Sequence, residues 1–173
     1  MQNEVIKAIM DRRSCKSYLP DEVPAEIIDQ VIEAGLYAAN GRGLQSPVIL
    51  AVTDKKLRDR LEELNASYLP KGGKPFYGAP VVLVVLADRN APTYLYDGSL
   101  AIGNMMLAAQ ALGVGSCWIH RAKQVFDSEE GKQILADLGI EGDYEGVGNC
   151  IIGYPAGEPK EAAPRREGRV FRA

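Results

Sequence analysis

The stretch from Tyr96 to Leu112 constrains the fold of this chain more than any other. It is the strongest helical segment in the sequence, yet apolar side chains cover almost its whole circumference: Leu100, Ile102, Met105, Met106, Leu107, Ala108, Ala109 and Leu112. A helix that is apolar on all sides is buried in a core or in an interface between subunits. Gly113 follows and is suited to end the helix. Because the chain has only 173 residues, we expect this helix to need a partner subunit.

Helical and strand patterns of ordinary length occupy the rest of the chain. The unbroken apolar run Val81–Leu86 has the composition of a strand buried on both faces. Further strands are predicted at Val48–Val52, Val114–Ile119 and Val147–Tyr154, and further helices before Arg12, after Pro24, and at Lys55–Leu64 and Ser128–Leu138. The elements do not alternate regularly as in a doubly wound fold. The sequence therefore predicts a single α+β domain over residues 1–173.

The composition excludes several classes of protein. A net charge of −3 and a pI near 5.3 argue against a general nucleic-acid binder, which needs a basic face. No apolar run is long enough to span a membrane, and the N-terminus lacks the apolar core of a secretion signal. The 3 cysteines form no CxxC pair, and the single histidine leaves no cluster of metal ligands. We therefore expect a cytoplasmic protein with no metal, membrane or nucleic-acid partner.

The common catalytic motifs are missing. There is no GxxxxGK[ST] phosphate loop, and the two glycine pairs 113/115 and 146/148 lack the third glycine of a dinucleotide fingerprint. His120 is the only histidine available as the base of a nucleophilic triad, and nothing around it resembles a nucleophile elbow. A nucleophilic triad based on His120 is therefore not expected.

Two small cationic clusters stand at opposite ends of the chain. One is Arg12–Ser17, directly after the first predicted helix, and the other is Arg165–Arg169 in the C-terminal tail. Guanidinium groups bind phosphate through paired hydrogen bonds, and a lysine adds a point charge. On the residues alone, the clusters are either a phosphate site or solvated charges at a helix end and in a tail.

The chain resembles the FMN-dependent nitroreductase family in four ordered motifs. They are Arg12–Tyr18, Ala38–Pro47, Asp97–Ala109 continuing to Leu112–Ile119, and Ile151–Pro155 leading to Pro164–Arg166. The third motif is the most specific. The resemblance implies a nitroreductase-like α+β fold with a central, mostly antiparallel sheet flanked by helices, in a homodimer.

The resemblance also implies a non-covalent FMN site. Arg12 and Ser14 would hold the phosphate and the ribityl oxygens. Lys16 would lie near the N1/O2 edge of the ring, where a cation stabilises the anion formed on reduction. The second motif departs from the family pattern, and Asn40 would supply the hydrogen bond lost there. The other implied contacts are Arg13, Gln45, backbone groups of Trp118, Ile119 and His120, and Arg165 or Arg166 at the phosphate.

The homodimer implied by the resemblance forms through the long helix and exchanged terminal segments, with flavin at the interface. Residues 155–173 would pack on the partner subunit. Met105 and Met106 are expected in the interface. For Asn104 we expect a structural hydrogen bond, either across the dimer or to a neighbouring backbone group, because an unpaired buried amide is costly.

The segment Asn65–Ala79 is long, aromatic and rich in glycine and proline, which is the composition of a mobile lid. Tyr68, Phe76 and Tyr77 are candidates to stack on the substrate. The alternative is that these rings fold onto the protein surface.

The mechanism implied by the resemblance is ping-pong. NADH or NADPH gives a hydride to flavin N5 and leaves, and a small acceptor such as a nitroaromatic or a quinone then takes the electrons. The sequence does not decide between the two nucleotides. Two alternatives stay open: an FMN-binding redox or sensing module without turnover, and a related flavoenzyme that removes a halogen or cleaves the flavin ring.

Overall fold

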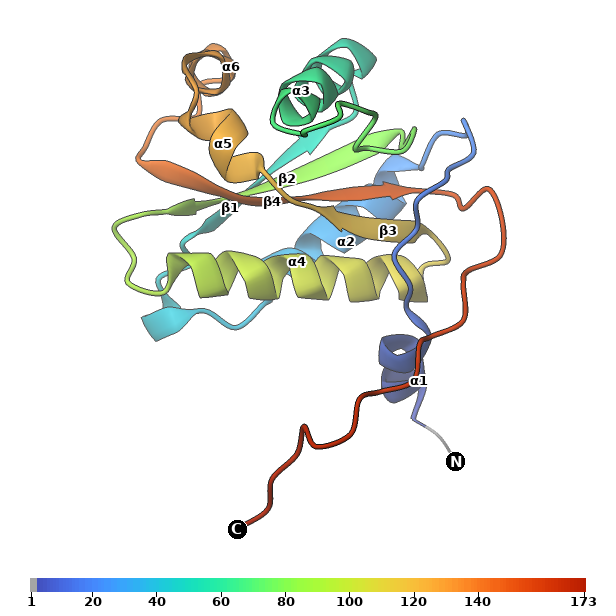
Figure 1. Cartoon of the computed structure of the whole chain (residues 1–173). Helices are drawn as coiled ribbons and strands as arrows, with labels where there is room; N and C mark the ends of the chain where they lie inside the picture. The colour runs from blue at the N-terminus through green and yellow to red at the C-terminus, as the bar shows by residue number, and fades with distance from the viewer. Residues whose placement is uncertain (1–2) are drawn as a thin grey trace.

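The computed structural model describes residues 3–173 and shows a central sheet between two layers of helices (Figure 1). Helices α3, α5 and α6 cover one face of the sheet, and α2 and α4 cover the other. The α+β prediction is confirmed. The elements are α1 (Glu4–Asp11), α2 (Ala25–Leu36), the short 3₁₀ turn η1 (Gly41–Gly43), β1 (Pro47–Val52), α3 (Lys55–Ser67), β2 (Val81–Asp88), α4 (Tyr94–Ala111), β3 (Gly115–Ile119), α5 (Ala122–Asp127), α6 (Glu129–Asp137) and β4 (Tyr144–Gly153).

The sheet has the strand order β1-β2-β4-β3, and every neighbouring pair is antiparallel. Strand β2 lies inside the sheet, and each residue of Val81–Ala87 is buried, as the unbroken apolar run predicts. Because side chains alternate along a strand, β2 supplies both cores. Val82 and Val84 pack toward α3, α5 and α6, and Leu83 and Val85 pack toward α2 and α4.

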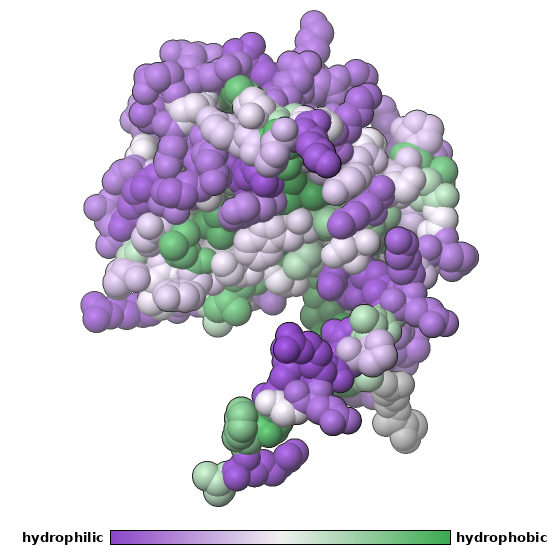
Figure 2. Space-filling view, viewed as in Figure 1, coloured by the Kyte–Doolittle hydropathy of each residue, from purple (hydrophilic) through white to green (hydrophobic). Residues whose placement is uncertain are grey.

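Helix α4 is buried on one side only. Met105 is fully buried in the core of its own subunit, so its predicted place in an interface is wrong. Asn104 Nδ2 donates to the carbonyl of Ala34 in α2 at 3.0 Å, which confirms the predicted structural bond. On the other side of α4, Tyr96 is 74% and Leu100 50% exposed. Figure 2 shows hydrophobic atoms in green among pale, weakly polar ones over this helix.

The structure differs from the predicted elements mainly around the last strand. Strand β4 begins at Tyr144 rather than Val147, and the short helix α5 was not predicted. A Cβ at Gly146 would lie 2.4 Å from the backbone of Ala122, so glycine is needed where α5 meets β4. Gly146 and Gly148 interrupt the apolar pattern from which a strand is predicted. Within residues 3–173, no helix is long and apolar enough to cross a membrane.

Helix α1 and the C-terminal tail project together from one corner of the molecule (Figure 1). Four apolar side chains of α1 are exposed, namely Val5, Ile6, Ile9 and Met10. Near the tip of the tail, Phe171 is 91% exposed. Both segments therefore leave apolar surface uncovered in a single subunit.

Candidate functional site

The segment that follows α1 runs along the edge of the sheet beside β3. The N–H of Cys15 donates to the carbonyl of Ser116 in β3 at 2.9 Å, and the N–H of Leu19 donates to the carbonyl of Tyr154 at 2.8 Å. Strand β3 is an edge strand, so its outer side is free to accept this segment. Backbone hydrogen bonds thus hold the first predicted motif against the sheet.

Arg12, Ser14 and Lys16 gather around the thiol of Cys117 in β3. The hydroxyl of Ser14 and the positive charges of Lys16 and Arg12 all act on this thiol and favour its ionised form. Burial has the larger influence and raises the pKa of Cys117, while these three neighbours oppose the rise. The structure therefore brings together three of the residues predicted to bind flavin.

One guanidinium nitrogen of Arg12 lacks an acceptor. Nη1 is buried and makes no hydrogen bond to any residue that the structure describes. A buried donor without an acceptor costs about 1–3 kcal/mol, and more when it is charged. Phosphate oxygens accept such bonds and balance the charge. The guanidinium, hydroxyl and ammonium groups at this position therefore fit the phosphate-bearing chain of FMN.

Arg13 uses its guanidinium inside the fold. Nη1 donates to the carbonyls of Met10 at 2.7 Å and Arg12 at 2.8 Å, and Nε donates to the carbonyl of Lys160 at 3.2 Å. These bonds join the end of α1 to the start of the tail. A structural role for Arg13 is visible, and its predicted contact with flavin stays a prediction.

The loop after α3 meets the first motif. Lys16 Nζ lies 5.8 Å from the centroid of the Tyr77 ring, within the range of a cation–π interaction. Tyr77 is 39% exposed and Tyr68 is 41% exposed, so both rings are available at the surface. The carbonyl of Tyr68 accepts a hydrogen bond from Arg121 Nε at 3.2 Å. Tyr68 and Tyr77 remain candidates for contact with the substrate.

Two predictions for the lid segment are wrong. Phe76 is only 2% exposed and belongs to the core between the sheet and α3, so its ring cannot stack on a substrate. The segment also begins later than predicted, because α3 continues to Ser67. Asn65 is buried there, and its Nδ2 donates to the carbonyl of His120 at 2.8 Å. The N–H of Phe76 donates to Glu62 Oε1 at 2.8 Å, which anchors the loop further.

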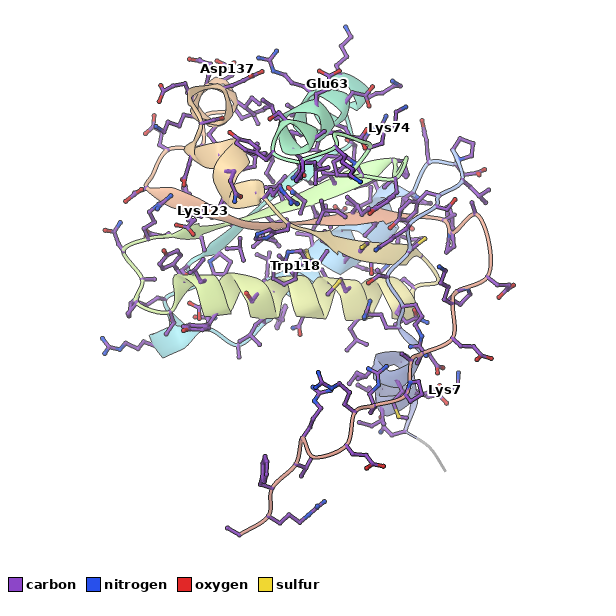
Figure 3. The ribbon with its side chains drawn as sticks, in the orientation of Figure 1. Lys7, Glu63, Lys74, Trp118, Lys123 and Asp137 are labelled. Carbon is purple, nitrogen blue, oxygen red and sulfur yellow. The ribbon has the colours of Figure 1, made fainter. Side chains whose placement is uncertain are left out.

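The side chains at the end of β3 pack mainly into the two cores. Trp118 lies between the sheet and α4, against Gly148 of β4 (Figure 3). Its ring is partly buried and packs against this core. The side chain of Ile119 is buried toward α3 and α5, and its carbonyl accepts from Asn149 Nδ2 at 3.4 Å. His120 is exposed. The contact of these backbone groups with flavin stays a prediction.

The second motif lies at the opposite end of α4. The N–H of Gly41 donates to Asp97, in the first turn of the helix, at 3.0 Å. The first motif binds Ser116, which follows the C-terminal end of the helix. An 18-residue helix is about 27 Å long. The structure therefore does not bring Asn40 and Gln45 close to Arg12 within one subunit.

Asp97 has a role that the sequence analysis did not assign. Its carboxylate is 2% exposed and accepts hydrogen bonds from Gly41 N–H, Ser46 Oγ and Thr93 Oγ1. The sequence signal for this role is an acidic residue inside an otherwise apolar helix, because a buried carboxylate needs donors. Asn40 also acts within the loop, where its Oδ1 accepts from the N–H of Gln45 at 2.9 Å.

The second cationic cluster stays apart from the first in this single subunit. Arg165 and Arg166 are exposed on the extended tail, which leads away from the sheet (Figure 1). Arg165 Nε donates to the carbonyl of Ala163 at 3.1 Å, within the tail itself. The predicted meeting of the two clusters at one phosphate is not formed within the subunit.

Comparison with known proteins identifies the family of the chain. The profile of the Nitroreductase family matches residues 9–154. An FMN reductase [NAD(P)H] of Bacillus subtilis is 31% identical over 195 residues, covering 95% of this chain and 74% of the relative. A nitroreductase from Bacteroides fragilis with bound FMN superposes with a TM-score of 0.88 at 27% identity, covering 99% of this chain and 100% of that one. An FMN-dependent nitroreductase from Clostridium difficile gives a TM-score of 0.87 at 25% identity, covering both chains completely. The chain belongs to the nitroreductase family.

Proposed function

We propose that this protein is an FMN-dependent oxidoreductase that passes electrons from NADH or NADPH to a small oxidised acceptor, such as a nitroaromatic or a quinone. The observation that carries the proposal is the buried, unpaired Nη1 of Arg12 beside Ser14 and Lys16. It is supported by the Bacillus subtilis relative, an FMN reductase [NAD(P)H], and by the FMN bound in the Bacteroides fragilis nitroreductase.

Each of the three residues around Cys117 would bind a different part of FMN. Arg12 would donate to the phosphate, since one of its buried nitrogens has no other acceptor among the described residues. Ser14 would bind a ribityl oxygen through its hydroxyl. Lys16 would hold a positive charge at the edge of the ring, with its ammonium over Tyr77. This charge favours the reduced, anionic form of the flavin.

The chemistry that FMN supplies when bound is the transfer of electrons from the nicotinamide to the acceptor. The protein orients the two substrates and sets the charge around the ring. Tyr68 and Tyr77 are both exposed, and Tyr77 lies beside Lys16. These two rings would form the wall against which the acceptor rests. No side chain of the cluster is required as an acid or a base, so we assign no catalytic residue.

We further propose that the protein is a homodimer with FMN at the interface. The two groups of predicted ligands lie at opposite ends of α4, so a two-fold axis across this helix would join Arg12 of one subunit to Asn40 and Gln45 of the other. The exposed apolar side chains on α4 and α1 supply a surface for such contact (Figure 2). Residues 155–173 would then pack on the partner subunit and carry Arg165 or Arg166 to the phosphate.

We propose a cytoplasmic location on the basis of the cysteines. Cys15, Cys117 and Cys150 are all free thiols in the structure. Reduced thiols of this kind are typical of proteins in the reducing interior of the cell.

The visible absorption spectrum of the purified protein tests the proposed function. We expect a flavin spectrum, release of FMN on denaturation, and bleaching on anaerobic addition of NADH or NADPH. The nucleotide that bleaches the spectrum faster identifies the preferred donor. A colourless protein that neither takes up added FMN nor oxidises either nucleotide would contradict the proposal.

A further inference from the structure

We propose that Asp97 is a positioning residue for the flavin site: its buried carboxylate holds the loop Asn40–Ser46 in the conformation that meets FMN. This inference rests on the proposed function, because the loop carries Asn40 and Gln45. It adds a residue that lies in a core helix and does not itself touch the cofactor.

The hydrogen bonds of Asp97 join both ends of the loop to α4. Oδ1 accepts from the N–H of Gly41 at 3.0 Å, and Oδ2 accepts from the hydroxyl of Ser46 at 2.9 Å. Oδ2 also accepts from Thr93 Oγ1, at the start of the helix, at 3.0 Å. Asp97 lies in the first turn of α4, where the helix dipole favours a negative charge. One carboxylate thus fixes the loop to the helix.

The loop has a backbone conformation that needs such support. Arg42 and Gln45 have φ values of 56° and 49°, in the left-handed region that favours glycine. Two such residues in one short loop are unfavourable unless surrounding contacts hold them. Arg42 is exposed. The bonds made by Asp97 offset this cost, together with the Asn40–Gln45 bond of 2.9 Å and the bond of 3.1 Å from the N–H of Leu44 to the carbonyl of Gly41.

At the Gly41 end of the loop, the hydrogen bond to Asp97 attaches the backbone to α4. The other end is also held by the sheet, because the carbonyl of Ser46 accepts from the N–H of Asp88 at 3.0 Å. At Gly41 the loop presses against the helix so closely that a Cβ would lie 2.1 Å from Thr93 Oγ1. Without the carboxylate, this end would leave the helix and the left-handed residues would relax.

A relaxed loop would weaken FMN binding, because the loop would have to become ordered at the moment of binding. The chemical step at saturating FMN would not change, since Asp97 contacts no reacting group. A weakened FMN affinity with an unchanged kcat at saturating FMN is therefore the signature of a positioning residue.

The test compares Asp97→Asn and Ser46→Ala with the matched control Ser99→Ala. Ser99 lies on the same helix, and its Oγ donates to the carbonyl of Leu95 at 2.7 Å. Trypsin cleavage after Arg42 in the FMN-free protein reports on the loop, and quenching of flavin fluorescence gives the FMN dissociation constant. We expect both Asp97→Asn and Ser46→Ala to speed this cleavage and to raise the dissociation constant about tenfold, as for the loss of a hydrogen bond to a charged group.

The control Ser99→Ala is expected to leave both measurements unchanged. Ser46→Ala removes a single hydroxyl and decides the question if Asp97→Asn does not fold. Cleavage no faster than in the unmodified protein would overturn the anchoring role of Asp97. Faster cleavage with unchanged FMN affinity would overturn the role of the loop in the site. Failure of the unmodified protein to bind FMN would instead overturn the proposed function, and the trypsin result would still distinguish it from failure of the anchor.

Discussion

The surroundings of Arg12 provide the most direct evidence for a bound anion. Its buried Nη1 makes no hydrogen bond to any of residues 3–173. In the FMN-free protein this nitrogen therefore destabilises the fold, and with FMN bound it would be satisfied by phosphate. Arg12 is therefore expected to lower the stability of the FMN-free protein and to strengthen the binding of FMN.

We expect Arg12→Ala to raise the FMN dissociation constant about 10- to 100-fold, the range for losing a hydrogen bond between charged groups. The melting temperature of the FMN-free variant should equal or exceed that of the unmodified protein, because a desolvated charge is removed. Flavin fluorescence and thermal unfolding measure the two effects. Arg60→Ala, which breaks only an exposed ion pair with Glu130, is the control. A less stable FMN-free variant with unchanged affinity would show that Arg12 is structural.

Cys150 gives the protein a defined response to alkaline pH. Burial raises its pKa to about 12, whereas a thiol in an unfolded chain titrates near 8.5. Between these values the folded thiol keeps its proton and the unfolded thiol loses it. The contribution of the Cys150 thiol to the free energy of unfolding is therefore complete below about pH 8.5. Above this pH it falls by about 1.4 kcal/mol per pH unit.

We expect Cys150→Ala to flatten this alkaline decline in the free energy of unfolding, measured with denaturant between pH 8 and 10. Part of the decline should remain, because burial also raises the pKa of Cys117 and Tyr18. Cys15→Ala, at a partly exposed thiol, is the control for loss of a cysteine. An unchanged pH dependence in Cys150→Ala would mean that its thiol is not shielded from water.

At the scale of elements, the packing of β4 against β3 and α4 depends on a glycine. A Cβ at Gly148 would lie 2.5 Å from Nε1 of Trp118 and 2.9 Å from Cδ1 of Ile102. All three residues belong to the core on the α4 side of the sheet or lie against it. The indole of Trp118 can approach β4 this closely only because residue 148 has no side chain.

We expect Gly148→Ala to lower the free energy of unfolding by about 1–3 kcal/mol, the usual cost of overpacking a core. Because the chain has 1 tryptophan, its fluorescence reports the accompanying displacement of the Trp118 ring. Gly157→Ala is the matched control, since nothing lies within 4 Å of its Cβ position. Equal stability of the two variants, with unchanged fluorescence, would contradict this account of the packing.

At the scale of the whole molecule, the separation of the predicted ligands implies that a complete site needs two subunits. Arg12→Ala and Gln45→Ala homodimers should both bind FMN weakly. In a mixed dimer, one site would combine the intact Arg12 of one chain with the intact Gln45 of the other. Random mixing in equal amounts should therefore restore about a quarter of the sites, because half of the dimers are mixed and each has one intact site.

Bound FMN per chain, measured after unfolding and refolding the two variants together, checks this expectation. Refolding each variant alone is the control. A mixture that binds no more FMN than the mean of the two controls would show that each site lies within one chain. The same outcome from a protein that is monomeric in solution would refute the proposed homodimer.

The α+β class, the buried strand β2 and the family could all be predicted from the sequence, whereas the roles of Arg12, Ser14 and Lys16 in binding FMN stay predictions. These features depend on local patterns, namely apolar periodicity and short motifs whose members are neighbours in the chain. The structural bond of Asn104 was also predictable, because a side-chain amide on an apolar helix needs a partner, although in the structure this side chain is exposed and not buried.

Other features became visible only in the folded chain: Phe76 is a core residue, Met105 is buried within its own subunit, and α3 continues through Asn65. Tertiary structure also brought Asp97 to the loop Asn40–Ser46, from which it is separated by about fifty residues of chain, and left the unpaired nitrogen of Arg12 in the interior. The physical reason is the same in each case. Whether a side chain is buried, and which donor meets which acceptor, depends on contacts between distant segments, and no local pattern in the chain encodes them.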